Sequence, residues 1–148
     1  MKSIFKATLA CIISIMCFSS CSDDKTYASL PVYEIGLSQG DGDIHVGDNV
    51  ILTLTNTNNP STYRYNSYRW ECTPEVDGLQ SATPNTNNSF KPLTRGKHTI
   101  TVKIDASNNA DGNASNNGKV IKRGETTNTY TVSTLKTYIT VERSIIVR

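Results

Sequence analysis

Few residues of this chain could carry out chemistry, and none of them stands in a catalytic motif. Beyond residue 21 the sequence holds two histidines, His45 and His98, and one cysteine, Cys72. General acid–base catalysis needs positioned titratable groups, and a nucleophilic cysteine needs a base within reach. No Cys–His pairing, phosphate-binding glycine loop, serine elbow or histidine-rich metal spacing occurs. We therefore expect no catalytic residue, metal ion or cofactor, and a core position for His98 and Cys72.

Two acidic loops contain oxygen ligands of the kind that calcium prefers. They are Asp41-Gly42-Asp43 with Asp48, and Asp105 with Asp111-Gly112-Asn113. The twelve-residue EF-hand pattern is absent from both, and turns favour the same Asp, Asn and Gly residues. We expect turns at these positions and no metal site.

Tyr63-Arg64-Tyr65 is the exposed group that we predict as a candidate ligand contact. Tyrosine rings can stack on the faces of sugars, and arginine and asparagine side chains donate hydrogen bonds to hydroxyl groups. Two interpretations stay open. The tyrosines either form a loop platform for a glycan or protein partner, or they cover the edge of a sheet.

The elements that must position these residues are strands. β-Branched alternation and closely spaced turn signals predict an all-β domain, and no window sustains a helical period. The expected long strands are residues 32–37, 49–55, 97–105 and 137–147, together with a strand that carries Tyr68, Trp70 and Cys72 on one face. Short strands are expected at residues 44–46 and 89–91. Residues 119–122 and 130–132 are expected to pair as a hairpin around Gly124. We also expect a chain break near Ser133-Thr134, and Trp70 as a core residue.

The first thirty residues have the composition of an export signal and a tether. Lys2 and Lys6 precede a short apolar run that extends to Phe18, which is too short to span a bilayer. Cys21 follows two serines, and this resembles the lipobox of a bacterial lipoprotein, in which the leader is removed and the cysteine is acylated. Ser22, Asp23 and Asp24 resemble the export signal of Bacteroidota surface lipoproteins. The alternative is a plain secretory signal cleaved nearby.

These boundaries give a signal peptide over 1–20, a lipidated cysteine with a flexible tether over 21–30, and a domain over 31–148. Residues 21–148 carry thirteen basic and thirteen acidic side chains, because two of the fifteen lysines and arginines lie in the leader. A neutral chain without a basic run argues against a nucleic-acid partner, and membrane attachment would depend on the acyl chains. Cys72 alone remains in the domain, so no internal disulfide is available.

Tyr68-Arg69-Trp70 followed by Gly96-Lys97-His98-Thr99-Ile100-Thr101-Val102 resembles the PKD-like domains of bacterial surface lipoproteins. The resemblance covers residues 32–147 and implies an immunoglobulin-like β-sandwich of about seven to eight strands. Two features depart from the PKD pattern. Glu71-Cys72-Thr73-Pro74 stands where PKD domains have Gly-Asp-Gly, and residues 108–133 are an insertion.

The resemblance implies a non-catalytic, lipid-anchored module at the outward face of a bacterial outer membrane. In that topology the B–C and F–G loops emerge at one end, and we expect Tyr63 and Tyr65 on the first and the Asn-rich insertion on the second. The leading hypothesis is a binding or accessory module for extracellular glycan beside a starch-utilisation-type uptake system. The alternative is a structural or adhesion component that contacts another surface protein through loops or an edge strand.

Overall fold

The computed structural model of the chain describes residues 30–58, 63–108, 116–133 and 136–148. The chain divides into two units, Met1–Leu30 and Pro31–Arg148. The expected signal peptide, Cys21, the export residues Ser22 to Asp24 and most of the tether lie outside the described residues. The description of the fold therefore concerns the second unit.

The second unit is built from strands, as the sequence predicts. Its described residues contain ten of them, more than the seven to eight expected. Their bounds are β1 (Val32–Leu37), β2 (Val50–Asn58), β3 (Tyr63–Thr73), β4 (Val76–Asp77), β5 (Ala82–Thr83), β6 (Asn87–Pro92), β7 (Gly96–Asn108), β8 (Val120–Arg123), β9 (Thr126–Val132) and β10 (Lys136–Val147).

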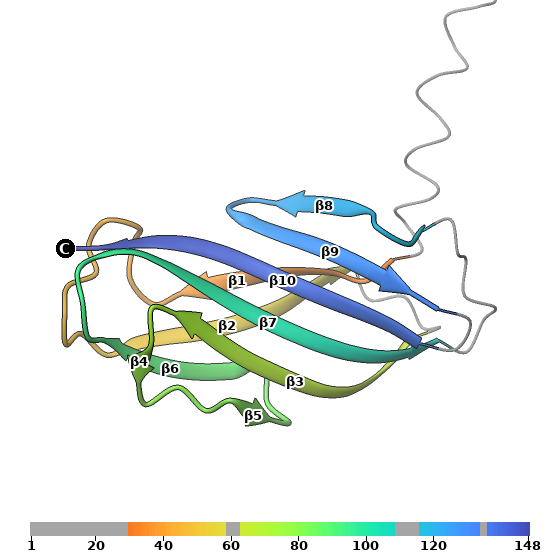
Figure 1. Cartoon of the computed structure of the whole chain (residues 1–148), viewed down its shortest axis with the longest axis horizontal. Helices are drawn as coiled ribbons and strands as arrows, with labels where there is room; N and C mark the ends of the chain where they lie inside the picture. Colours follow the sequence, from red (N-terminus) through yellow and green to blue (C-terminus); the bar gives the residue numbers. More distant parts are fainter. Residues whose placement is uncertain (1–29, 59–62, 109–115, 134–135) are drawn as a thin grey trace, which may run out of the picture. The chain divides into compact units, whose positions relative to one another are not determined.

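The strands form two antiparallel sheets in a sandwich-like arrangement. The order is β1-β2-β6-β4 in the four-stranded sheet and β5-β3-β7-β10-β9-β8 in the six-stranded sheet. Figure 1 shows the long strands of both sheets running along the same long direction of the molecule. The interior between the two sheets is the core.

The alternating sequence pattern explains which side chains enter this core. In β2, Val50, Leu52 and Leu54 are buried while the residues between them are exposed. In β7, the buried residues are His98, Ile100, Val102, Ile104 and Ala106. Successive side chains of a strand point to opposite faces, so one apolar face per strand is enough to close the sandwich.

Trp70 lies at the centre of the core, as predicted, with 1% of its surface exposed. It is opposite Val102 of β7, which in turn is opposite Val141 of β10. His98 is also buried, as predicted, and its Nδ1 lies 3.2 Å from the Gly96 carbonyl. Cys72 is only half-buried, because it lies close to the end of β3.

Two predicted elements differ from the structure. Residues 44–46 form no strand, since Ile44 makes only an isolated parallel bridge to Val147. Tyr63, Arg64 and Tyr65 do not lie in a loop before the Trp70 strand but within β3 itself, where they pair with residues 106–108 of β7. A register shift between Tyr65 and Ser67 lets the long strand keep its pairing on both sides of the irregularity.

The predicted insertion carries the predicted hairpin. β8 and β9 pair around the turn at Gly124, and β9 then pairs with β10 after the expected break near Ser133. The hairpin therefore extends the six-stranded sheet beyond β10.

The hairpin also covers the free edge of β1. Side chains of β9 and β10 bond to backbone groups of β1 and of the residue before it, where a neighbouring strand would otherwise be needed. The bonds run from Tyr33 N to Asn128 Oδ1 (2.9 Å), Asn128 Nδ2 to Tyr33 O (2.9 Å), Ile35 N to Thr126 Oγ1 (3.1 Å), Arg143 Nη1 to Ile35 O (2.6 Å) and Tyr130 Oη to Pro31 O (2.6 Å).

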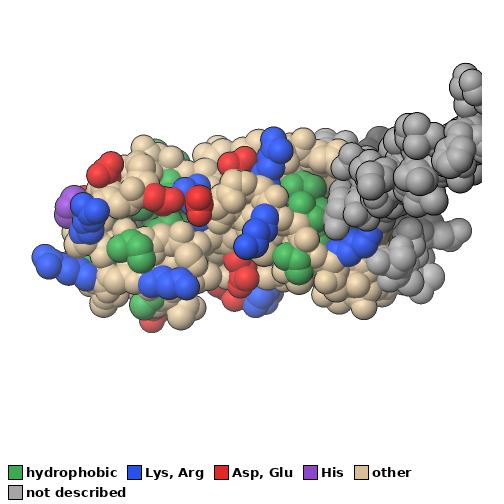
Figure 2. All heavy atoms as spheres, turned by 90° about the horizontal axis from the view of Figure 1, so that it is seen from above, with side chains coloured by type: hydrophobic (Ala, Val, Ile, Leu, Met, Phe, Trp, Pro, Cys, Tyr) green, Lys and Arg blue, Asp and Glu red, His purple; other side chains and the backbone are tan. Residues whose placement is uncertain are grey.

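The surface is mixed in character. Figure 2 shows one face on which Lys and Arg side chains alternate with Asp and Glu, and on which hydrophobic side chains are scattered. Among the described residues, no helix is long and apolar enough to cross a membrane.

Candidate binding site at the distal end

The sandwich has two ends with different roles in the chain. At the proximal end β1 begins at Val32, opposite Asn58 of β2, and β3 begins at Tyr63, opposite Asn108 of β7. At the distal end β1 finishes at Leu37, β7 begins and β10 finishes. The ends of these strands are visible in Figure 1. The chain thus enters the sandwich at the proximal end, so any tether leaves from there.

The predicted contact group lies at the proximal end. Arg64 is exposed, whereas Tyr65 is half-buried. The Tyr65 ring meets that of Tyr33 edge-on, with centroids 5.9 Å apart, and its hydroxyl accepts a hydrogen bond from Asn56 Nδ2 (3.0 Å). The side chain of Tyr63 lies outside the described residues. Tyr65 therefore packs between the sheets, and its ring face does not form a loop platform.

The acidic loop at residues 38–49 is held against strand ends at the distal end. Val46 N donates to the Arg148 carbonyl (3.3 Å), and Gly47 N donates to the Pro92 carbonyl (2.9 Å). The Asp48 carboxylate accepts from His45 N (2.8 Å), which is the turn role that the sequence predicts for it. Among the described residues, no three His, Cys, Asp or Glu side chains group as metal ligands do.

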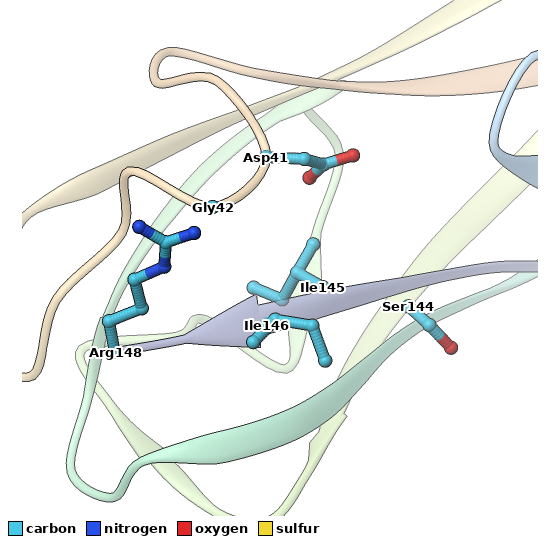
Figure 3. A pocket seen from close by; sticks show the side chains of 6 residues that line it. All are labelled: Asp41, Gly42, Ser144, Ile145, Ile146 and Arg148. Atoms are coloured by element: carbon cyan, nitrogen blue, oxygen red, sulfur yellow. The ribbon is translucent and has the colours of Figure 1, made fainter.

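A groove of about 360 Å³ opens between this loop and the end of β10. Figure 3 shows Ile145 and Ile146 on opposite sides of β10, with Arg148 reaching toward the loop at Gly42. The lining residues are Asp41, Gly42, Ser144, Ile145, Ile146 and Arg148. Gly42 has a φ of +91°, and a Cβ there would lie 3.4 Å from Arg148 Nη2, so the loop turns at a residue without a side chain.

The two charged side chains of the groove differ in their partners. Asp41 pairs with Arg143, whose Nη2 lies 2.9 Å from Asp41 Oδ2. The Arg143 side chain is only 14% exposed, and its other terminal nitrogen holds the Ile35 carbonyl. Arg148 is exposed, and no carboxylate of the described residues lies within 4.0 Å of its guanidinium. The cation of Arg148 is therefore the available charge of the groove.

Part of β10 has no strand on the edge that faces the groove. On one edge β10 pairs with β7 over its whole length. On the other edge β9 pairs as far as Arg143, and the next contact is the parallel bridge between Ile44 and Val147. No strand of the described part of the chain pairs with this second edge at residues 144–146.

The direction of the backbone groups on this edge follows from Arg148. Its N–H donates to the Ile44 carbonyl (2.9 Å) and its carbonyl accepts from Val46, so both groups point to the loop side. Successive residues of a strand direct their N–H and C=O groups alternately to the two edges. Ser144 and Ile146 therefore direct theirs to the groove side. The parallel bridge of Ile44 with Val147 engages the Ile146 carbonyl, and the last β9 pair sets the Ser144 N–H against the turn at Glu125, so the Ser144 carbonyl and the Ile146 N–H are the groups that remain.

Sequence reasoning missed this site, although one signal was present. It identified Asp41 and Gly42 as turn residues, and it used Ile145 and Val147 as core residues of the last strand. Ile146 breaks the alternation between them and is 52% exposed. The signal is weak, because single exposed aliphatic residues are common and Ile51, Leu93 and Val120 are exposed to a similar extent.

Chemically, the groove offers backbone hydrogen bonds, one cation and one exposed aliphatic side chain. These are means of binding, since no acid–base pair converges on it. Comparison of the chain with family models, with curated proteins and with solved structures gave no match.

Proposed function

We propose that this chain is a non-catalytic, lipid-anchored binding module displayed outward from a bacterial outer membrane, and that it contacts another surface protein through its distal end. The anchor is Cys21, and Ser22, Asp23 and Asp24 act as the export signal. The groove between the acidic loop and β10 makes the contact.

The proposal includes an immunoglobulin-like sandwich. With β1, β2, β6 and β4 as strands A, B, E and D, the four-stranded sheet has the order A-B-E-D. With β3, β7 and β10 as strands C, F and G, the six-stranded sheet contains C-F-G, to which β5, β8 and β9 are added. Trp70 is buried on β3, which is strand C in this assignment, and a buried Trp on strand C is typical of immunoglobulin domains.

One observation carries the functional proposal: the chain enters at one end of the sandwich and the groove opens at the other. A tether of nine residues reaches at most about 30 Å. A domain held that close to a membrane by its proximal end presents its distal end to partners.

Site-specific photo-crosslinking tests this orientation of binding. A photoreactive phenylalanine replaces Ile146 at the distal end, and a matched variant carries it at the exposed Arg64 of the proximal end. On intact cells we expect a discrete protein adduct from position 146 and at least about 10-fold less of that adduct from position 64, since such crosslinkers react only with what they touch. Adducts from position 64 alone, or equal adducts from both, would contradict the proposal.

A glycan ligand is the second candidate, and one observation favours it. Tyr138 is 44% exposed on the outer face of the six-stranded sheet, opposite Asp105 and Thr131. The Asp105 carboxylate has its Oδ2 4.0 Å from Lys136 Nζ. An exposed ring beside a carboxylate, an ammonium group and a hydroxyl group fits a sugar.

Glycan arrays probed with the full chain and with Tyr138→Ala test this candidate. Loss of a glycan signal in Tyr138→Ala, with unfolding free energy changed by less than about 1 kcal/mol, would favour it. A Thr140→Ala variant on the same face is the matched control, and an equal effect of both changes would count against a site centred on Tyr138.

A further inference from the structure

We propose that the outer face of the four-stranded sheet binds a neutral saccharide in a cleft lined by amide side chains. This amide cleft lies between β2, β6 and the segment that follows β4. Its lining residues are Asn49, Ile51, Gln80, Asn87, Asn88 and Ser89, and its volume is about 400 Å³. Ligand sites have volumes of roughly 300–1,000 Å³. The inference goes beyond the proposed function and does not depend on the distal contact.

The register of β2 and β6 explains why a hollow forms here. The two strands are neighbours in the four-stranded sheet (Figure 1), and Ile51 is directly opposite Ser89. The adjacent pair, Val50 and Phe90, is buried in the core, so Ile51 and Ser89 point to the outer face. The short side chain of Ser89 leaves space beside the longer side chain of Ile51.

Asn88 fixes the wall of the cleft that carries Gln80. The Asn88 side chain donates to the Gln80 carbonyl (2.8 Å) and accepts from Gln80 N (3.2 Å) and Ser89 N (2.9 Å). The next residue, Ser81, accepts a hydrogen bond from Trp70 N of β3 (2.8 Å). The wall is therefore tied to both sheets, and a wall already in place loses less conformational entropy when a ligand binds.

The free amides determine the chemistry of the ligand. Asn49, Gln80 and Asn87 are exposed, and their side chains make no hydrogen bond to another residue that the structure describes. A primary amide has two N–H donors and a carbonyl acceptor, and a hydroxyl group is both donor and acceptor. The three amides can therefore pair with the hydroxyl groups of a sugar in either role.

Charge and apolar surface narrow the class further. No residue that lines the amide cleft carries a charge, so a charged group of a ligand would lose water there without gaining an ion pair. Ile51 is 50% exposed and offers aliphatic surface to the C–H groups of a sugar ring. A neutral saccharide fits this combination better than an anionic or a wholly apolar ligand.

NMR titration of the full chain in detergent tests the cleft through its own side-chain amides. The probes are the neutral trisaccharides of glucose, mannose and galactose, with trigalacturonate as the anionic counterpart. At least one neutral probe should shift the side-chain NH₂ signals of Asn49, Gln80 and Asn87. The NH₂ signal of Asn88 is the internal control and should shift less, because it already donates to Gln80.

Variants of the cleft separate this site from others. Ser89→Phe should weaken binding of the best neutral probe by at least about 10-fold, because the ring fills the hollow, and an exposed strand position accepts an aromatic residue. Gln80→Ala should weaken it about 2- to 10-fold, as for one neutral hydrogen bond. Thr55→Ala is the matched control on the same outer face of β2, outside the cleft, and should leave binding unchanged.

The inference fails if no neutral probe shifts the three amides, if trigalacturonate binds most tightly, or if Ser89→Phe folds and binds as the parent chain does. If Ser89→Phe does not fold, Gln80→Ala combined with Asn87→Ala replaces it, and unchanged binding in that variant would overturn the inference. Loss of binding in Tyr138→Ala alone would overturn it in favour of a site on the six-stranded sheet. Crosslinking at the distal end is independent of these results, so either proposal can fail without the other.

Discussion

Asn128 supplies part of the pairing that β1 would otherwise need from a strand. Its side-chain oxygen accepts from Tyr33 N and its side-chain nitrogen donates to Tyr33 O, both at 2.9 Å, and the residue is fully buried. A single amide side chain thus satisfies both backbone groups of one residue. Nothing in the local sequence distinguishes this asparagine from the many that lie in turns, because its partner is 95 residues away.

We predict that Asn128→Ala lowers the free energy of unfolding by about 2–4 kcal/mol. Two buried backbone groups lose their partners, and each costs about 1–3 kcal/mol. Urea denaturation followed by tryptophan fluorescence measures the change. Thr127→Ala on the opposite face is the control, with an expected change within about 1 kcal/mol. Equal losses of unfolding free energy in both variants would mean that the hydrogen bonds from Asn128 to β1 do not stabilise the fold more than the Thr127 side chain does.

Stability should fall in alkaline solution because two acids, the half-buried Cys72 and the buried Tyr33, resist ionisation. Burial raises the pKa of the Cys72 thiol to about 11, although a backbone hydrogen bond from Thr73 lowers it in part. Burial, together with the neighbouring phenols of Tyr65 and Tyr68, raises the pKa of Tyr33 well above its usual value of 10. Above the unfolded-state pKa values the folded chain binds more protons than the unfolded chain, so stability decreases with rising pH.

Denaturation midpoints measured from pH 8 to 11 test this prediction. We expect the loss to begin near pH 9, where the thiol ionises in the unfolded chain, and to steepen above pH 10, where Tyr33 adds its share. Cys72→Ala should remove the first part of the loss and keep the second. A midpoint that stays constant across this range would contradict the assigned burial of both groups.

At the scale of elements, the β8–β9 hairpin decides which edges of the sandwich are open. It extends the six-stranded sheet, and its side chains cover the free edge of β1. Its own outer strand, β8, is short and ends in the exposed Lys122 and Arg123. Short charged edges oppose unwanted pairing. On its outer edge the long strand β3 is paired with β5 only at Tyr68 and Arg69, so β3 has the more extensive open edge among the described long strands.

Removing the hairpin should make the chain self-associate. Replacing residues 118–132 with a Gly-Ser linker leaves the N–H and C=O groups of Tyr33 and the N–H group of Ile35 unpaired on an exposed edge. We expect dimers or larger species in analytical ultracentrifugation at concentrations where the parent chain is monomeric. Asn128→Ala is the control, since it keeps the hairpin in place and should stay monomeric. A monomeric deletion variant would show that the hairpin does not protect β1.

Local patterns predicted the strands well and their long-range neighbours poorly. The alternation of β2, β7 and β10 follows from residue types alone, and so does the turn at Gly124. Tyr63, Arg64 and Tyr65 follow turn residues and so favoured a loop, but ladder bonds to β7 extend β3 over them. The groove depends on where β9 stops relative to β10, and no local pattern encodes that register.

For the whole molecule, the account depends on polarity along the long direction of the sandwich. The chain enters where β1 begins, and the distal groove lies beyond the other ends of β1 and β10. If the chain is anchored at Cys21, this polarity turns the groove away from the membrane. An unanchored chain would have no preferred orientation, and the proposed function would lose its physical basis.

Mass spectrometry of the mature protein purified from cells tests this anchor most directly. Our account predicts a protein in the membrane fraction that begins at Cys21 and carries the added mass of acyl chains, and it predicts that Cys21→Ser releases the protein from that fraction. A mature chain that begins elsewhere, lacks acyl mass at Cys21 and is found free in the medium would contradict the account.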